Sequence, residues 1–167
     1  MALIVEHLAG QGRQKMAFIG ASNGGDARGR ERRDGAENAA RRLGLPKIEF
    51  LDAGPAPVSM RQGAELTKAL GRDVARYDAL LCVSDPVAFG ALSECRRMGI
   101  DVPCDLAITG FGHFDVAAIS DPRITTVDVS SERIGQEVAG LLGRIFDEEI
   151  TPERIDVGAR LIPGETG

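Results

Sequence analysis

Short apolar runs alternate with longer amphipathic stretches along most of the chain. The runs predict buried strands at 15–20, 48–53, 78–83, 104–109, 124–128 and 155–162. The amphipathic stretches predict helices at 2–10, 28–44, 58–74, 86–99 and 130–147. Strands that alternate with helices in this way are typical of an α/β fold with a doubly wound parallel sheet.

The segment 80–115 carries the clearest local signals. Residues 80–83 form a short apolar strand, and Ser84-Asp85-Pro86 predicts the start of the next helix because it joins capping side chains to an early proline. Gly99 is expected to end that helix, and a glycine-bracketed loop at 110–112 follows the next strand. The inward stripe of the helix is expected to consist of Ala88, Leu92 and Cys95.

Ligands of open α/β sheets bind outside the carboxyl ends of the strands. Here those ends are followed by residues 20–27, 84–85 and 110–113. Arg32 is expected to reach the same rim, because it lies one turn before Ala36 on a helix predicted to bury Ala36, Ala39, Ala40 and Leu43. An ion pair with a neighbour such as Asp26 is the structural alternative.

Two polar residues at the rim have alternative roles. The Ser84 hydroxyl can cap its helix or face the cleft, and Asp85 is more typical of a helix cap than of a ligand group. The remaining arginines of helix 28–44 are interpreted as a solvated face: Arg28, Arg30, Arg33, Arg41 and Arg42.

The bulk composition narrows the class of protein. A chain of 167 residues with 43% hydrophobic and 27% charged residues is expected to form one globular domain. A net charge of −5 disfavours a surface that grips nucleic acid directly. We expect a cytoplasmic protein without membrane contact, because no apolar run has membrane-spanning length and residues 1–9 do not form an export signal.

The reactive side chains do not form a known catalytic or metal-binding pattern. Cys82, Cys95 and Cys104 are expected to be reduced, buried thiols, and no zinc-ligand spacing links them to His7 or His113. Phosphate-loop, dinucleotide and nucleophile-elbow motifs are absent, so we expect neither a cofactor nor enzymatic activity. A small enzyme that uses His113 as an acid or base is the weakest alternative.

Several segments resemble the effector domains of lactose-repressor-type (LacI/GalR) transcriptional regulators, which are related in fold to periplasmic sugar-binding proteins. The resemblance rests on VEHLAGQGRQKMAFIG, RRDGAENAARRLGL, VSDPVAFGALSECRRMGIDVPCDLAITGF and DPRITTVDVSSERIGQEVAGLL. It implies two lobes with a sugar or another small metabolite between them. Residues 15–128 and 150–165 would form the C-terminal lobe, and 1–14 and 129–149 would be remnants of the N-terminal lobe. The DNA-binding helix-turn-helix would be absent.

The resemblance also implies an effector site. Arg32 falls on the effector-binding arginine of the family pattern, Ser84 and Asp85 on its Asn-Asp pair, and Gly112-His113 on the loop where many members place an aspartate. Without that carboxylate the pocket favours an anion over a neutral hexose. The GFGH variant, the helix segment SECRRMGI and the closing segment ARLIPGETG look closest to gluconate-operon repressors, so a sugar acid such as gluconate is the expected effector.

The same resemblance implies partners. Operator DNA would be bound only through the missing headpiece, and a homodimer would use Phe89 and Ile119. Helix 130–147 would then expose part of its apolar stripe, which includes Ile134, Val138, Leu141, Leu142 and Ile145. The alternative from another class is a solute-binding component of a sugar uptake system, which an upstream export signal would distinguish from an upstream helix-turn-helix.

Overall fold

A computed structural model describes residues 1–22, 25–146 and 154–167. In this part of the chain a parallel sheet forms the centre of the molecule, in the order β2 (Glu49–Asp52), β1 (Met16–Gly20), β3 (Ala79–Cys82) and β4 (Ala107–Thr109). Every residue of β1, β3 and β4 is buried, as expected for strands covered on both faces. The predicted α/β fold with a doubly wound parallel sheet is confirmed.

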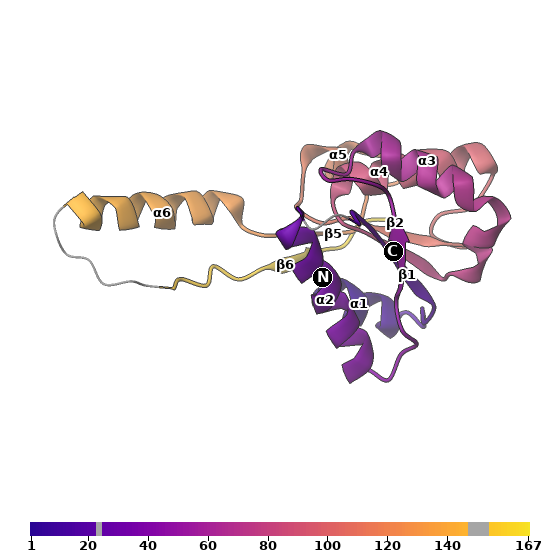
Figure 1. Cartoon of the computed structure of the whole chain (residues 1–167), viewed down its shortest axis with the longest axis horizontal. Coiled ribbons are helices and arrows are strands. Elements are labelled where there is room, and N and C mark those ends of the chain that lie inside the picture. Colours follow the sequence, from indigo (N-terminus) through magenta and orange to yellow (C-terminus); the bar gives the residue numbers. More distant parts are fainter. Residues whose placement is uncertain (23–24, 147–153) are drawn as a thin grey trace.

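Two pairs of helices cover the sheet. Figure 1 shows α3 (Met60–Leu70) and α4 (Asp85–Met98) on one side of it, and α1 (Ala2–Gly10) and α2 (Ala27–Arg42) on the other. Ser59 and Gln62 form a reciprocal capping box at the start of α3, and Gly99 ends α4 in the left-handed conformation predicted for it. The buried face of α4 contains the predicted Ala88, Leu92 and Cys95.

Glycines let α3 and α4 pack at close range. A Cβ atom added to Gly90 would lie 1.9 Å from the carbonyl oxygen of Met60, and one added to Gly63 would lie 2.4 Å from that of Val87. Neither position has room for a side chain, so the two backbones approach each other directly.

A small second sheet pairs β5 (Thr126–Asp128) antiparallel with β6 (Arg160–Ile162). The chain end then returns to the main sheet, because the buried Thr166 donates a hydrogen bond of 2.5 Å from Oγ1 to the Ile108 carbonyl. The Ile108 amide in turn donates to the Thr166 carbonyl at 2.8 Å. Residues 160–167 are therefore part of the main body.

Several expectations about burial and elements need correction. Leu43 is exposed because α2 ends before it, and Cys104 is exposed whereas Cys82 and Cys95 are buried as predicted. A 3-10 helix, η1 (Gly71–Arg76), replaces the end of the predicted helix 58–74, and a short helix, α5 (Asp115–Ile119), was not predicted. Strands β4 and β6 are also shorter than predicted.

The N-terminal helix α1 packs closely against the main body. Ile4, Val5 and Leu8 are completely buried, and α1 contacts α2, β5 and β6. The apolar face of α1 thus contributes to the core of the main body.

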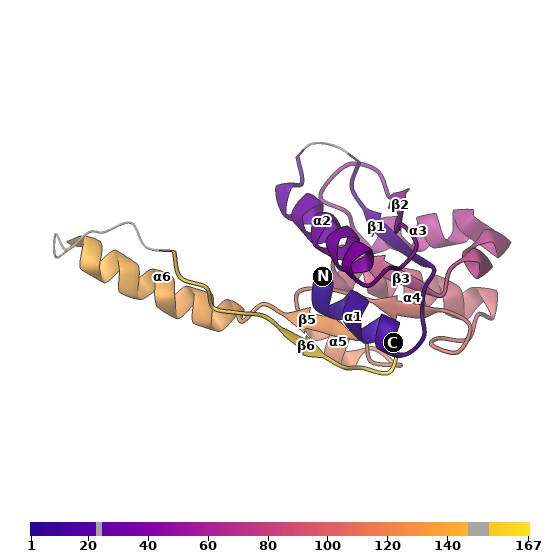
Figure 2. The same ribbon diagram turned by 90° about the horizontal axis from the view of Figure 1, so that it is seen from below.

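The helix α6 (Ser131–Phe146) projects away from the body in both views (Figures 1 and 2). Ile134, Val138 and Leu142 are between 41% and 50% exposed, so the expected exposure of its apolar face is confirmed for these residues. Some predicted positions lie outside the described set: the side chain of Ile145, residue 147 of the predicted helix, and residues 150–153 of the proposed C-terminal-lobe segment. The described helices include none with the length and apolarity needed to cross a bilayer.

Candidate functional site

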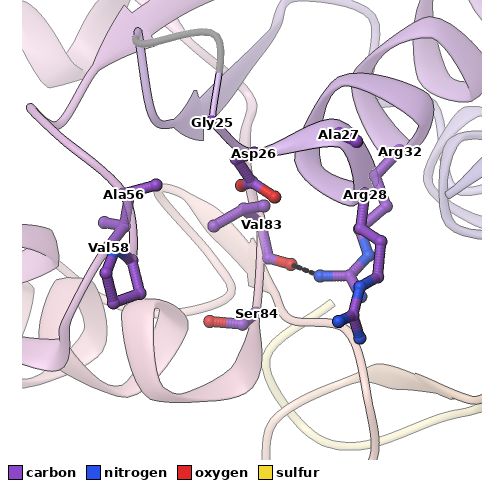
Figure 3. Close-up of a pocket in the computed structure, with 10 residues that line it drawn as sticks. Gly25, Asp26, Ala27, Arg28, Arg32, Ala56, Val58, Val83 and Ser84 are labelled. Carbon is purple, nitrogen blue, oxygen red and sulfur yellow. Dashed lines mark hydrogen bonds between the residues drawn. The ribbon is translucent and has the colours of Figure 1, made fainter.

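A depression of about 600 Å³ lies at the carboxyl ends of the first three strands of the sheet (Figure 3). Three segments form its walls: the start of α2 after β1, residues 56–58 after β2, and residues 83–84 after β3. This is the place where the strand order reverses between β1 and β3, which is the usual ligand position in an open α/β sheet.

Arg32 lies at the rim of this depression, as its place on the α2 stripe predicted. Its Nη1 donates a hydrogen bond of 2.8 Å to the Val83 carbonyl, and its guanidinium lies 4.3 Å from the centre of the Phe111 ring. Burial lowers the pKa of this half-buried arginine, while the nearby Asp26 carboxylate raises it. The guanidinium is therefore held in one orientation by a carbonyl on one side and an aromatic ring on the other.

The Asp26 carboxylate has a structural task of its own. Its Oδ1 accepts a hydrogen bond of 2.8 Å from the Gly29 amide and caps the start of α2. The influence of Asp26 on Arg32 is thus exerted from a cap position, in place of the ion pair considered as the structural alternative.

Ser84 also lines the depression. It occupies the N-cap position of α4, but its side chain makes no capping hydrogen bond. Figure 3 shows the Ser84 hydroxyl at the depression, below Val83 and across from Arg28. Of the two roles predicted for this hydroxyl, the structure favours the one that faces the cleft.

Asp85, the first residue of α4, is completely buried. Its Oδ2 accepts a hydrogen bond of 2.7 Å from the Phe114 amide, and its Oδ1 accepts one of 2.5 Å from the Thr126 hydroxyl. Burial raises the pKa of this carboxyl, and the two hydrogen bonds oppose that increase. Asp85 therefore connects the start of α4 to the loop after β4 and to β5.

Gly112 belongs to that loop and has a conformation that suits glycine. Its φ angle is 121°, and an added Cβ would lie 2.5 Å from the Phe114 ring. Its amide donates a hydrogen bond of 2.9 Å to the Val127 carbonyl. The positive φ angle and the nearby Phe114 ring therefore disfavour an aspartate at this position.

His113 lies in a different place from Arg32 and Ser84. Its Nδ1 is 4.0 Å from an Asp128 carboxylate oxygen, and that same oxygen lies 3.0 Å from Nη2 of Arg160. These three side chains line a second depression of about 540 Å³, together with the first turns of α6. The structure therefore places the predicted residues Arg32 and Ser84 at the first depression and His113 at the second.

One lining residue of the first depression differs from the position that the sequence pattern predicts for it. Arg28, assigned to the solvated face, lines the depression beside Arg32 (Figure 3). Their spacing of four residues, which places side chains on one helical face, was the available signal. The wall at 56–58 lacked such a signal, because a turn rich in proline could contact any neighbouring segment.

Two further groups of side chains with possible reactivity are the buried thiols and the potential metal ligands in the part of the chain that the structure describes. Burial raises the pKa of Cys95 to about 11 and raises that of Cys82 further, so both thiols stay protonated. Within residues 1–22, 25–146 and 154–167, no group of three or more His, Cys, Asp or Glu side chains could hold a metal ion.

Comparison with known proteins gives a consistent family. A family model described as a periplasmic binding protein-like domain matches residues 5–166. The HTH-type transcriptional regulator GntR of Escherichia coli K12 is 38% identical over 124 residues, which cover 69% of this chain and 38% of the relative. The HTH-type transcriptional regulator GntR of Pseudomonas aeruginosa is 32% identical over 164 residues, which cover 96% of this chain and 47% of the relative.

A solved structure agrees with these relatives. The crystal structure of transcription regulator GntR from Chromobacterium violaceum has a TM-score of 0.89 and 33% identity, and the match covers 99% of this chain and 60% of that one. The chain spans less than half the length of the two curated relatives. Because the family model matches nearly all of its residues, the chain belongs to the periplasmic-binding-protein-like domain family, in which its relatives are transcriptional regulators of the LacI type.

Proposed function

We propose that this chain is the ligand-sensing part of a LacI-type transcriptional regulator. The observation that carries the proposal is the fixed Arg32 guanidinium at the rim of a depression on the carboxyl edge of the sheet. The relatives are regulators and share the fold over almost the whole chain, which supports a sensing role over catalysis.

The mechanism is linkage between ligand binding and DNA binding. A ligand that prefers one arrangement of the protein shifts the population toward it, with a typical coupling free energy of about 1–3 kcal/mol. In this chain the Asp85 carboxylate joins the start of α4, the loop at 110–114 and β5, and β5 leads directly into α6. A ligand that contacts Ser84 would therefore act next to Asp85. The hydrogen bond between Asp85 and Thr126 connects this position to β5, the strand that leads into α6.

The effector class that we propose is a sugar acid, with gluconate as the leading candidate. Arginine binds a carboxylate through two parallel hydrogen bonds, and Gly112 leaves out the carboxylate that would repel it. Similarity to two regulators named GntR supports the same class. Operator DNA would be bound by a separate headpiece, and we place the intact regulator in the cytoplasm, where its operator is.

Calorimetric titration of the intact regulator with D-gluconate and with D-glucose tests this function. We expect gluconate to bind, glucose not to bind, and Arg32→Ala to abolish gluconate binding. Arg76→Ala is the matched control, because Arg76 is an exposed arginine that pairs with Glu49 at the start of β2, at the opposite end of the strands from the depression. Glucose binding, or gluconate binding that is unaffected by Arg32→Ala, would contradict the sugar-acid assignment.

We also propose a homodimer that uses Phe89 and Ile119. Ile119 on α5 is 79% exposed, whereas Phe89 on α4 is half-buried against the core. α5 packs on α4, so both side chains belong to one region of the surface. Sedimentation of Ile119→Asp and Phe89→Asp variants should show a shift to monomer, with the larger shift for Ile119→Asp; an unchanged dimer in both would refute this interface.

A further inference from the structure

Arg32 uses part of its hydrogen-bonding capacity inside the protein. One nitrogen donates to the Val83 carbonyl, and the face of the guanidinium covers the Phe111 ring. Arg32 therefore has a fixed position, but it has fewer N–H groups to offer a ligand than a free arginine side chain.

Arg28 lies one helical turn earlier and lines the same depression. Figure 3 shows the two arginine side chains running from α2 along the same wall, toward the level of Ser84. They are also close enough to interact electrostatically, since Arg28 lowers the pKa of Arg32. Unlike Arg32, Arg28 is exposed and can adjust to a ligand.

Other arginines of α2 are directed elsewhere. Arg33 pairs with Glu37 at 2.8 Å and lies over the Phe50 ring, and Arg42 pairs with Glu6. Arg30 and Arg33 line a different, smaller depression beside Phe18 and Phe50. Arg28 and Arg32 are thus the arginines of this helix that the described structure places at the candidate site.

The charges at the depression do not balance. Its lining contains two guanidinium groups, those of Arg28 and Arg32, and one carboxylate, that of Asp26. The Asp26 carboxylate already accepts a hydrogen bond from the Gly29 amide as a helix cap. Asp85 and Glu31 also act on Arg32, but they do not belong to the lining. The lining itself therefore presents one positive charge in excess, which favours a ligand with one negative charge.

From this arrangement we infer that Arg28 is a specificity-determining residue, which makes the depression select an acid over the corresponding neutral sugar. The ligand class is a polyhydroxylated carboxylic acid whose carboxylate is shared by the guanidinium groups of Arg28 and Arg32. Ser84 would then contact hydroxyl groups from the opposite wall. This inference rests on the proposed sensing function and adds the residue that sets its charge selectivity.

The test is titration of the intact regulator with D-gluconate at low and physiological salt. Arg28→Gln should weaken gluconate binding at least about tenfold and reduce its salt dependence, because it removes one charge-assisted contact that salt screens. Arg28→Lys should recover part of the affinity, since lysine keeps the charge but loses the fork geometry. Arg30→Gln is the matched control, because it makes the same charge change two residues away, at the other depression.

The outcomes separate this inference from the proposed function. Unchanged gluconate affinity in Arg28→Gln, with binding lost in Arg32→Ala, would overturn the role of Arg28 and leave the sensing function intact. An equal loss in Arg28→Gln and Arg30→Gln would also overturn it, because general electrostatics would then explain both. If the unaltered regulator bound no sugar acid at all, the proposed effector class itself would fail. Circular dichroism should show that the Arg28 and Arg30 variants, which alter exposed residues, are folded.

Discussion

Helices α4 and α6 have similar sequence patterns but opposite environments. Both follow a strand, both have similar length, and each carries an apolar stripe at helical spacing. α4 buries its stripe against the sheet and α3, whereas the stripe of α6 is about half exposed. Periodicity therefore predicts a helix and its apolar face, but not the surface on which that face packs.

Their first turns differ in the same way. Asp85 at the start of α4 is bonded to the loop after β4 and to β5. The start of α6 is held by a local contact, in which the Ser130 amide donates a hydrogen bond of 2.8 Å to Asp128 Oδ1. α4 is therefore fixed by bonds between distant segments, and α6 by bonds within its own connecting segment.

The largest effect should come from a charge placed on each apolar stripe. Leu92→Glu should lower the free energy of unfolding by about 4 kcal/mol or more, because it buries an unpaired carboxylate in the core. Leu142→Glu should change it by less than about 0.5 kcal/mol, because that side chain is half exposed. Urea unfolding followed by circular dichroism measures both, and a large loss from Leu142→Glu would show that α6 packs on the body.

A smaller contrast should come from glycine substitutions in the two helices. Gly90→Ala should destabilise by about 1–3 kcal/mol, because its Cβ would meet the Met60 carbonyl and force α3 and α4 apart. Gly140→Ala meets nothing within 4 Å and should favour helix formation by about 0.5–1 kcal/mol. Thermal unfolding distinguishes the two, and equal effects would mean that the close approach at Gly90 is relaxed in solution.

The smallest expected effect is a pH dependence at the start of α4. Burial raises the folded-state pKa of Asp85 above its unfolded value, so the associated stabilisation is present below the unfolded pKa of about 3.9. It is lost as the pH rises through the folded pKa. Asp85→Asn cannot titrate, so the stability of this variant relative to the unaltered protein should improve as the pH is raised.

Urea unfolding of the two proteins at a series of pH values checks this direction. Asp128→Asn is the contrasting control, because hydrogen bonds from the Ser130 amide and Arg160 lower the pKa of Asp128. Its relative stability should therefore worsen as the pH rises from the acid range. The same trend in both variants would mean that Asp85 is more hydrated than the structure indicates.

The residue pattern alone predicts the elements and the approximate rim of the site. Apolar runs located the parallel strands because both faces of those strands are covered, and helical spacing placed Arg32 at the strand ends. It did not reveal α5 or η1, which are too short for a periodic signal. The spacing that places Arg28 beside Arg32 was present, but the abundance of arginines on that helix obscured it.

The three-dimensional fold is needed to know which segments meet. It placed α1 in the core, left α6 apart from the body, and separated His113 from Arg32 and Ser84. It also showed that Asp85 is occupied by bonds to Phe114 and Thr126, which no local pattern indicates. The physical reason is that periodicity and capping depend on neighbouring residues, whereas these contacts join segments far apart in the chain and depend on how every element packs at once.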